Sequence, residues 1–288
     1  MKILFVGVFD TSRHSTNTSQ LLCLKRLGHE VSAYNYRAKA ARLGNRTRDQ
    51  HLVETIEARS FDLVIYSKCN QISSTAFTKI GELATTCLWF MDPLQTYTQE
   101  MREKTQLVDY FCCDKKNVLE EALLLNPNSF HVCEGFDEDV DRPMPADKCH
   151  DVSFIGTVYG DRADFMESLR PPPTLVTGCY GVEHAIAVGK SRINLNFCTN
   201  YGASDRIYKI LAAGGFLLTN DWYGREDDFT DGEDLVIFED SADLGNKVDY
   251  YLKHPGEAAQ IAQKGHTTVQ KYTRLKWAEK IVGLYEAL

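Results

Sequence analysis

The sequence predicts an α/β protein made of two doubly wound domains, each with a parallel sheet. Short apolar runs alternate with amphipathic stretches along the whole chain, which is the order of βαβ units. The apolar run at residues 2–9 and the run Val152–Gly156 share one pattern, in which a glycine and a polar loop follow the apolar residues. Between them, residues 135–151 are acidic, contain proline and read as a linker. We therefore expect an N-terminal domain at residues 1–145, a C-terminal domain at 146–272 and a final helix at 273–288 that packs back towards the N-terminal domain.

The N-terminal half supports this interpretation element by element. Residues 2–9 are apolar throughout, as in a strand buried on both faces. Thr18 or Ser19 can cap the first helix, and Gly28 can end it. The expected strands are 2–9, 29–34, 62–66, 86–91, 108–113 and 130–132, and the expected helices are 18–27, 50–59, 74–83 and 116–125.

The C-terminal half repeats the alternation after the linker. Residues 204–219 combine a capped amphipathic helix, two glycines and an apolar strand. The expected strands are 152–156, 174–176, 193–195, 215–219 and 235–238, and the expected helices are 206–213, 242–252, 255–272 and 276–288.

Composition narrows the class of protein. The chain has 288 residues, of which 43% are hydrophobic and 25% charged, as in a soluble globular protein. Its nine cysteines include no C-x-x-C pair, so we expect reduced thiols in a cytoplasmic protein. No apolar stretch is long enough to span a membrane, and the first run reads as a buried strand because polar residues begin at Asp10.

The helix that begins after Ser204 is the strongest candidate for a ligand site. Ser204 or Asp205 can cap it, and Gly214 can end it in a left-handed conformation. The free amide groups and the positive dipole end of such a helix suit a diphosphate. Arg206 in the first turn adds a bidentate phosphate donor, and Lys209 shares its face. The alternative is an ordinary helix–strand junction with solvated charges.

These residues resemble the group 1 glycosyltransferases, and most closely their spore-maturation-protein-B-like branch. The resemblance rests on Ser204–Thr219, on Asp231–Val236 with Ala242–Leu244, and on Phe130–Asp137 with Pro143. It implies the GT-B fold, in which two Rossmann-like domains face each other across a cleft. It also implies a hexosyltransferase-type reaction with a nucleotide sugar as co-substrate, held mainly by the C-terminal half, without a metal or another cofactor.

The chain departs from this family at one pair of positions. Many members have glutamates where this sequence has Tyr201 and Lys209, and the second glutamate binds the donor ribose. A lysine there favours a phosphate contact or an unusual donor.

The resemblance places further donor contacts in two segments. Gly156, Thr157 and Arg162 occupy the loop that would face the donor phosphates, where glycine permits close backbone approach. Asn196 lies in the segment that would line the base pocket. A surface arginine and a polar strand edge are the alternatives.

The N-terminal half would supply the acceptor site and any general base. Asp10 and His14 follow the first strand, and Asp92 follows another, at the edge where doubly wound sheets bind ligands. Any of these three side chains could deprotonate an acceptor hydroxyl. Loop or capping roles are the alternatives.

A basic segment suggests one acceptor. Tyr34 and Tyr36 precede five cations that have no acid among them, and such a segment could grip a phosphate backbone while the tyrosines stack on a displaced base. A hydroxymethylated base in DNA is then a candidate acceptor, as for some viral enzymes that act in the host cytoplasm. The formal net charge of −8 and an ordinary basic surface argue against it. The five cations are Arg37, Lys39, Arg42, Arg46 and Arg48.

Other functions stay open. A non-catalytic nucleotide-sugar-binding module, an epimerase of the same fold, and an enzyme acting on a glycan or small-molecule acceptor all fit the same elements.

Overall fold

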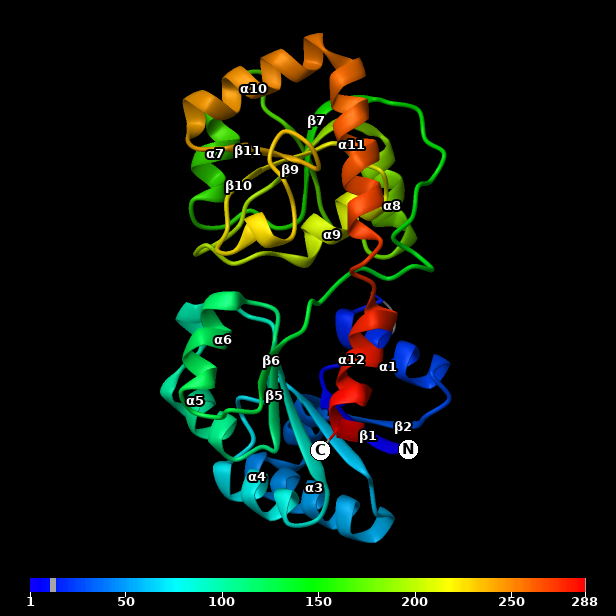
Figure 1. Cartoon of the computed structure of the whole chain (residues 1–288), viewed down its shortest axis with the longest axis vertical. Helices are drawn as coiled ribbons and strands as arrows, with labels where there is room; N and C mark the ends of the chain where they lie inside the picture. The colour runs from blue at the N-terminus through cyan, green and yellow to red at the C-terminus, as the bar shows by residue number, and fades with distance from the viewer. Residues whose placement is uncertain (11–13, 288) are drawn as a thin grey trace. The chain divides into compact units, whose positions relative to one another are not determined.

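The computed structural model describes residues 1–10 and 14–287, and its internal contacts divide the chain into two units (Figure 1). The N-terminal unit comprises Met1–Glu134 and Arg274–Leu288, and the C-terminal unit comprises Gly135–Thr273. The division thus falls at residue 134, before the boundary at 145 that we expected. The reason is that Phe136 already pairs with the end of the C-terminal unit, where its amide donates to the Tyr272 carbonyl at 3.1 Å.

The described residues of the N-terminal unit contain a six-stranded parallel sheet in the order β2-β1-β3-β4-β5-β6. The chain runs from β1 to β2 on one side and then returns to β3 on the other, so the order reverses between β1 and β3. The strands are β1 (Lys2–Gly7), β2 (Glu30–Asn35), β3 (Leu63–Ser67), β4 (Thr85–Phe90), β5 (Tyr110–Cys113) and β6 (Ser129–His131).

Helices cover both faces of this sheet. Two clusters of buried apolar side chains, one on each face, form the core of the unit. The basic segment forms α2 and the first turn of α3, which adds a helix to those expected from the sequence. The helices are α1 (Thr16–Arg26), α2 (Tyr36–Leu43), α3 (Asn45–Arg59), α4 (Ser74–Gly81), α5 (Gln99–Gln106), α6 (Lys116–Leu123) and α12 (Arg274–Ala287).

The last helix completes one face of the N-terminal sheet. Figure 1 shows α12 beside α1, although these helices come from opposite ends of the chain. Trp277 of α12 is buried, and its ring lies 6.1 Å from that of Phe5 and 5.6 Å from that of Trp89. This aromatic packing explains why Arg274–Leu288 groups with the N-terminal unit.

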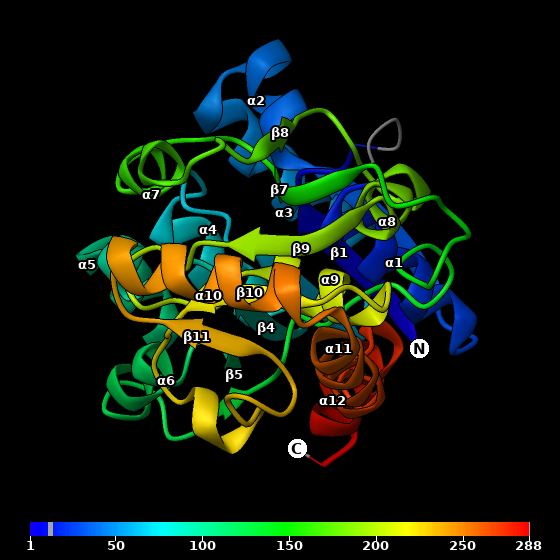
Figure 2. The same cartoon turned by 90° about the horizontal axis from the view of Figure 1, so that it is seen from above.

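The C-terminal unit has its own parallel sheet. Within the described residues it contains five strands in the order β11-β10-β9-β7-β8, and Figure 2 shows β9 between β7 and β10. The strands are β7 (His150–Ile155), β8 (Thr174–Val176), β9 (Ser191–Asn196), β10 (Leu217–Asn220) and β11 (Val236–Phe238). The helices are α7 (Arg162–Ser168), α8 (Val182–Gly189), α9 (Asp205–Ala212), α10 (Ser241–Lys253) and α11 (Pro255–Val269).

Two general expectations can be compared with the structure. All nine cysteines lie in the described ranges, and all are free thiols. Among the helices of the described residues, none has the length and apolar character that crossing a membrane requires.

Candidate functional site

The candidate site lies at the carboxyl ends of β7 and β9 in the C-terminal unit. From β7 the chain passes to β8 on one side and then crosses to β9 on the other, so the strand order reverses between β7 and β9. Open α/β sheets bind ligands at this kind of switch point. Gly156 follows β7, Asn196 ends β9, and Ser204 precedes α9.

Arg206 is anchored at this point by both neighbouring strands. Its Nε donates to the Ile155 carbonyl at 2.6 Å, and its Nη1 donates to Asn196 Oδ1 at 2.9 Å. The guanidinium carbon lies 4.9 Å from the centre of the Phe154 ring. Its Nη2 makes no hydrogen bond within the described part of the chain. Arg206 therefore has one N–H₂ group left for a ligand.

Gly156 makes this arrangement of Arg206 possible. Its φ is +148°, and a Cβ at this position would lie 2.6 Å from Arg206 Nη2. A larger residue would displace the guanidinium group or the backbone. Burial lowers the pKa of Arg206 from its ordinary value, and nearby Arg162 acts in the same direction while Asp205 opposes it. An arginine remains protonated in a protein, so its charge is available to an anion.

The start of α9 is also open to a ligand. Ser204 stands at the cap position, but its hydroxyl makes no capping bond and donates instead to Asn196 Oδ1 at 2.9 Å. The first amide groups of a helix have no partner within the helix. Together with the helix dipole they form a site for an anion beside Arg206.

Asn196 organises this site through its side chain. Its Oδ1 accepts hydrogen bonds from Ser204 and Arg206, and its Nδ2 donates to Thr219 Oγ1 at 2.9 Å. The side chain is fully buried. The structure thus gives Asn196 the role of orienting Arg206, where the sequence suggested a contact with the nucleotide base.

Two cations expected at the donor phosphates also have partners within the protein. Lys209 forms an ion pair with Asp205 one turn earlier in α9. Arg162 is 7% exposed, and it donates to the carbonyls of Thr157 at 3.0 Å and Phe197 at 3.3 Å. Arg162 therefore ties together the loops that follow β7 and β9.

Gly214 lies away from these residues. It follows the carboxyl end of α9, with a φ of +74°. A helix of eight residues is about 12 Å long, so Gly214 cannot contact a diphosphate bound at the start of α9. Gly214 therefore stays a predicted donor contact only for a part of the donor other than the diphosphate.

His184 on α8 adds a neutral side chain near this site. Burial is the main cause that lowers its pKa to about 3, and the charges of Lys209 and Arg206 contribute. Sequence alone does not separate this histidine from the solvated ones, because its burial depends on α8 packing against α9.

The N-terminal unit has a similar switch point between β1 and β3. Gly7 ends β1, and a Cβ there would lie 2.8 Å from Asn17 Nδ2. Asn17 donates to the Val8 carbonyl at 3.0 Å and accepts from Ser67 Oγ at 2.8 Å. Asn17 and Ser67 are not among the site residues that the sequence predicts. The apolar run that ends in a glycine was the signal for them.

The candidate bases occupy loops at this edge of the N-terminal sheet. The Asp10 amide donates to Ser15 Oγ at 3.2 Å, just before α1 begins. His14 lies in the same loop, with a φ of +47°. Asp92 Oδ1 accepts from Lys68 Nζ at 2.6 Å in an ion pair. All three side chains follow the carboxyl ends of strands, but each has contacts within the protein.

The structure buries both tyrosines and one of the five cations of the basic segment. Tyr34 and Tyr36 are only 4% and 1% exposed, so the expectation that they stack on a displaced base is wrong. Arg48 has no exposed surface and donates to the carbonyls of Tyr36 and Gln71, which excludes a phosphate contact. Of the other cations, Arg37, Arg42 and Arg46 are exposed, and Lys39 is half-buried. Arg37 also donates to the Tyr36 hydroxyl, and Lys39 contacts His51.

Metal ligation finds no support in the described residues. Within residues 1–10 and 14–287, no group of three or more His, Cys, Asp or Glu side chains lies close enough together to hold a metal ion.

Comparisons with known proteins bear on the family and the fold of the chain. The family model described as "Glycosyl transferase-like" matches residues 151–282, a little under half of the chain. A comparison with curated protein sequences finds no match.

Three solved structures share the whole architecture. The structure of Anabaena HepE in complex with UDP-glucose has a TM-score of 0.75 at 10% identity, with both chains fully covered. The sucrose-phosphate synthase of Thermosynechococcus elongatus has a TM-score of 0.72 at 11% identity, covering 100% of this chain and 98% of that one. A glycosyltransferase from Rickettsia africae ESF-5 has a TM-score of 0.69 at 12% identity, covering 99% and 98%. The chain therefore has the GT-B fold.

Proposed function

We propose that this chain is a glycosyltransferase that takes a sugar from a nucleoside-diphosphate sugar bound by the C-terminal unit. The observation that carries the proposal is the open start of α9 with Arg206 Nη2 and Gly156 beside it, at the switch point of the sheet. The glycosyltransferase-like family model matches the same unit. HepE has been solved with UDP-glucose and with UDP, so UDP is the first nucleotide to test.

The proposed site matches the charge that develops during transfer. When the bond between the sugar and the diphosphate breaks, the leaving diphosphate gains negative charge. Positive groups that are already in position stabilise this charge most effectively. Arg206 and the first amides of α9 would supply them, and we propose that the reaction therefore needs no bound metal. Added EDTA should then leave transfer unchanged.

Lys209 would act on the donor site indirectly, through its ion pair with Asp205. The Asp205 carboxylate lies in the first turn of α9, where it would repel a diphosphate. Its ion pair with Lys209 offsets that charge. We propose that the lysine keeps the start of α9 favourable for an anion, in place of the ribose contact that the family's glutamate makes.

The acceptor would bind to the N-terminal unit, with Asp92, Asp10 and His14 as candidate bases. The ion pair with Lys68 occupies the Oδ1 atom of Asp92 and leaves Oδ2 to face an acceptor hydroxyl. A hydroxymethylated DNA base is a weaker candidate acceptor, because Tyr34 and Tyr36 are buried and Arg48 is inaccessible. Hexosyl transfer onto a glycan or a small molecule does not require these three side chains to contact the acceptor.

Binding of UDP tests the donor site directly. We expect UDP to raise the melting temperature of the wild-type protein. The Arg206→Ala variant should bind UDP about 10- to 100-fold more weakly, because a hydrogen bond to a charged group contributes about 1.5–3 kcal/mol. Isothermal titration calorimetry gives both affinities.

The matched control is Arg192→Ala, which removes an exposed arginine from the other end of β9. This variant should bind UDP as the wild type does. Equal affinity of the wild type and Arg206→Ala would remove Arg206 from the donor site. Slow release of UDP from UDP-glucose without an acceptor would separate an enzyme from a non-catalytic binding module.

A further inference from the structure

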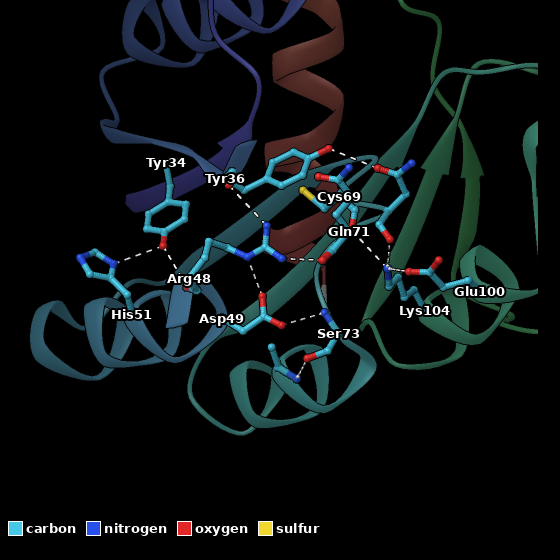
Figure 3. Close-up of polar contacts among 12 residues, drawn as sticks. Tyr34, Tyr36, Arg48, Asp49, His51, Cys69, Gln71, Ser73, Glu100 and Lys104 are labelled. Atoms are coloured by element: carbon cyan, nitrogen blue, oxygen red, sulfur yellow. Dashed lines mark hydrogen bonds and ion pairs between the residues drawn. The ribbon is translucent and has the colours of Figure 1, made fainter. Parts of the chain in front are cut away.

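The turn that follows β3 in the N-terminal unit is held in place by two buried cations. Figure 3 shows Arg48 between Tyr36 and Asp49, with its guanidinium group directed at the Gln71 carbonyl, to which Nη2 donates. From the other side, Lys104 Nζ donates to the carbonyls of Cys69 at 3.2 Å and Asn70 at 3.0 Å. Residues 69–71 therefore receive three hydrogen bonds from two charged side chains.

Buried charges and neighbouring residues hold this turn in one specific backbone conformation. Neither Arg48 nor Lys104 has any exposed surface, and burying a charge is unfavourable unless it is fully paired. Lys68 and Cys69 have φ values of +62° and +55°, a conformation that residues other than glycine seldom adopt. Strain of this kind persists where the surrounding structure imposes it, and it concentrates at functional sites.

The turn forms one wall of a hollow of about 610 Å³ in the N-terminal unit. Asn45, Arg46, Asn70 and Gln71 contribute exposed side chains to its lining. Within the described ranges, the side-chain amides of Asn45 and Gln71 make no hydrogen bond, and Asn70 uses only its Oδ1, which accepts from Tyr36. The hollow thus offers several amide donors and acceptors on a rigid frame.

The charges around the hollow favour a ligand rich in hydroxyl groups over a nucleic acid. Its two carboxylates, Asp49 and Glu100, form ion pairs with Arg48 and Lys104, so the buried cations neutralise them. Arg46 is the one cation among the lining residues that the structure describes. A single accessible cation does not suit a nucleic-acid backbone, whose binding depends on several phosphate contacts. Amide groups, each with a donor and an acceptor, suit a ligand rich in hydroxyl groups.

We propose that this hollow binds a saccharide, which is the acceptor of the transfer reaction. The proposal rests on the glycosyltransferase function proposed above. In that reaction an acceptor hydroxyl oxygen forms a bond to the anomeric carbon of the donor sugar. The bond from that carbon to the diphosphate oxygen breaks with both electrons remaining on the nucleoside diphosphate. The hydroxyl proton passes to one of the candidate bases named above and from there to solvent. Arg48 and Lys104 are positioning residues, because they act through the turn.

Saturation-transfer NMR with free saccharides tests the proposal on the full chain. The probes are maltose, cellobiose, N-acetylglucosamine and glucuronic acid. At least one should bind to the wild type, and Asn70→Ala and Gln71→Ala should each weaken that binding about tenfold, as expected for the loss of one hydrogen bond. Gln50→Ala, which removes an exposed amide from α3 outside the hollow, should leave it unchanged.

The outcomes separate this proposal from the proposed function. UDP affinity should be the same in all of these variants, because their substitutions lie in the N-terminal unit. If UDP binds but no saccharide does, or if saccharide binding survives both substitutions, the acceptor proposal is overturned and the donor function stands. If an oligonucleotide carrying 5-hydroxymethylcytosine binds in place of the saccharides, the ligand class is wrong. Failure of every common nucleoside diphosphate, UDP among them, to bind would refute the underlying function.

Discussion

Arg206 illustrates how a single side chain depends on residues far from it in sequence. Its guanidinium group is held by the Ile155 carbonyl, 51 residues earlier, and by Asn196, 10 residues earlier. These two bonds leave one N–H₂ group directed past Gly156. The position of that group depends on Gly156 having no side chain, since a Cβ would overlap with it.

Gly156→Ala should therefore disturb both stability and UDP binding. The left-handed φ of +148° imposes strain on alanine, and the new Cβ would lie 2.6 Å from Arg206 Nη2. We expect a loss of about 1–3 kcal/mol in the free energy of unfolding. UDP affinity should fall about as much as in Arg206→Ala. Urea unfolding and calorimetry measure these two effects.

Gly245→Ala is the control for this substitution. Gly245 lies within α10, and a Cβ there would meet no atom within 4 Å. Alanine should stabilise the helix by about 0.5–1 kcal/mol and leave UDP binding unchanged. A fully stable Gly156→Ala variant that binds UDP normally would contradict our account of the glycine.

Among the elements, the pair α8 and α9 contains a buried histidine that responds to pH. The pKa of His184 is lowered to about 3, mainly by burial. In the unfolded chain its pKa returns to about 6.5, so the unfolded state binds more protons than the folded state between these values. The contribution of His184 to stability is therefore present above pH 6.5 and is lost as the pH falls towards 3.

His184→Phe should remove this part of the pH dependence. Between pH 6.5 and about 4, the free energy of unfolding of the wild type should fall more steeply than that of the variant, by a few kcal/mol in total. Urea unfolding at a series of pH values measures the slopes. His254→Phe, at an exposed histidine, should keep the steep slope of the wild type. Parallel slopes in the wild type and His184→Phe would show that His184 is not buried in its neutral form.

The turn between β3 and α4, beside the proposed acceptor hollow, is also positioned by buried side chains from other elements. Arg48 and Lys104 are long cations on α3 and α5, and both elements approach the turn from outside the sheet. The helices therefore position a loop, and the loop in turn presents Asn70 and Gln71. A substitution in α5 can in this way affect a hollow whose amide lining lies largely on other elements.

At the scale of the whole molecule, the chain leaves the N-terminal unit after Glu134 and returns to it at Arg274. The returning helix, α12, covers one face of the N-terminal sheet with Trp277, which is packed on Phe5 and Trp89. The N-terminal unit is therefore incomplete until the last residues of the chain have been added.

Trp277→Ala should destabilise the N-terminal unit by about 3–5 kcal/mol, as for other large-to-small substitutions of buried aromatic residues. Hydrogen exchange should show faster exchange in β1 and β4, which carry Phe5 and Trp89, than in the wild type. UDP binding should persist, because the proposed donor site lies wholly in the C-terminal unit. Trp277→Phe should retain most of the stability. Loss of UDP binding with no change in exchange would contradict this assignment.

The local pattern of the sequence was sufficient for much of this fold. Alternation of apolar runs and amphipathic stretches predicted every strand that the structure describes, but it missed the helices α2, α5, α7 and α8. The glycine after residues 152–155 marked the donor-side switch point. The helix after Ser204 was also predicted, because capping residues and glycines act on their immediate neighbours. These signals are local, so a single sequence contains them.

What only the tertiary structure decided is which charged and aromatic side chains are buried. Arg48, Arg162 and Arg206 look alike in the sequence, yet the first is inaccessible, the second ties two loops together, and the third keeps an N–H₂ group for a ligand. The exposure and hydrogen bonding of each arginine depend on oxygen acceptors that the fold brings from other elements. Hydrophobic periodicity indicates which face of an element is buried, but it does not identify the hydrogen-bond acceptors that other elements place against that face.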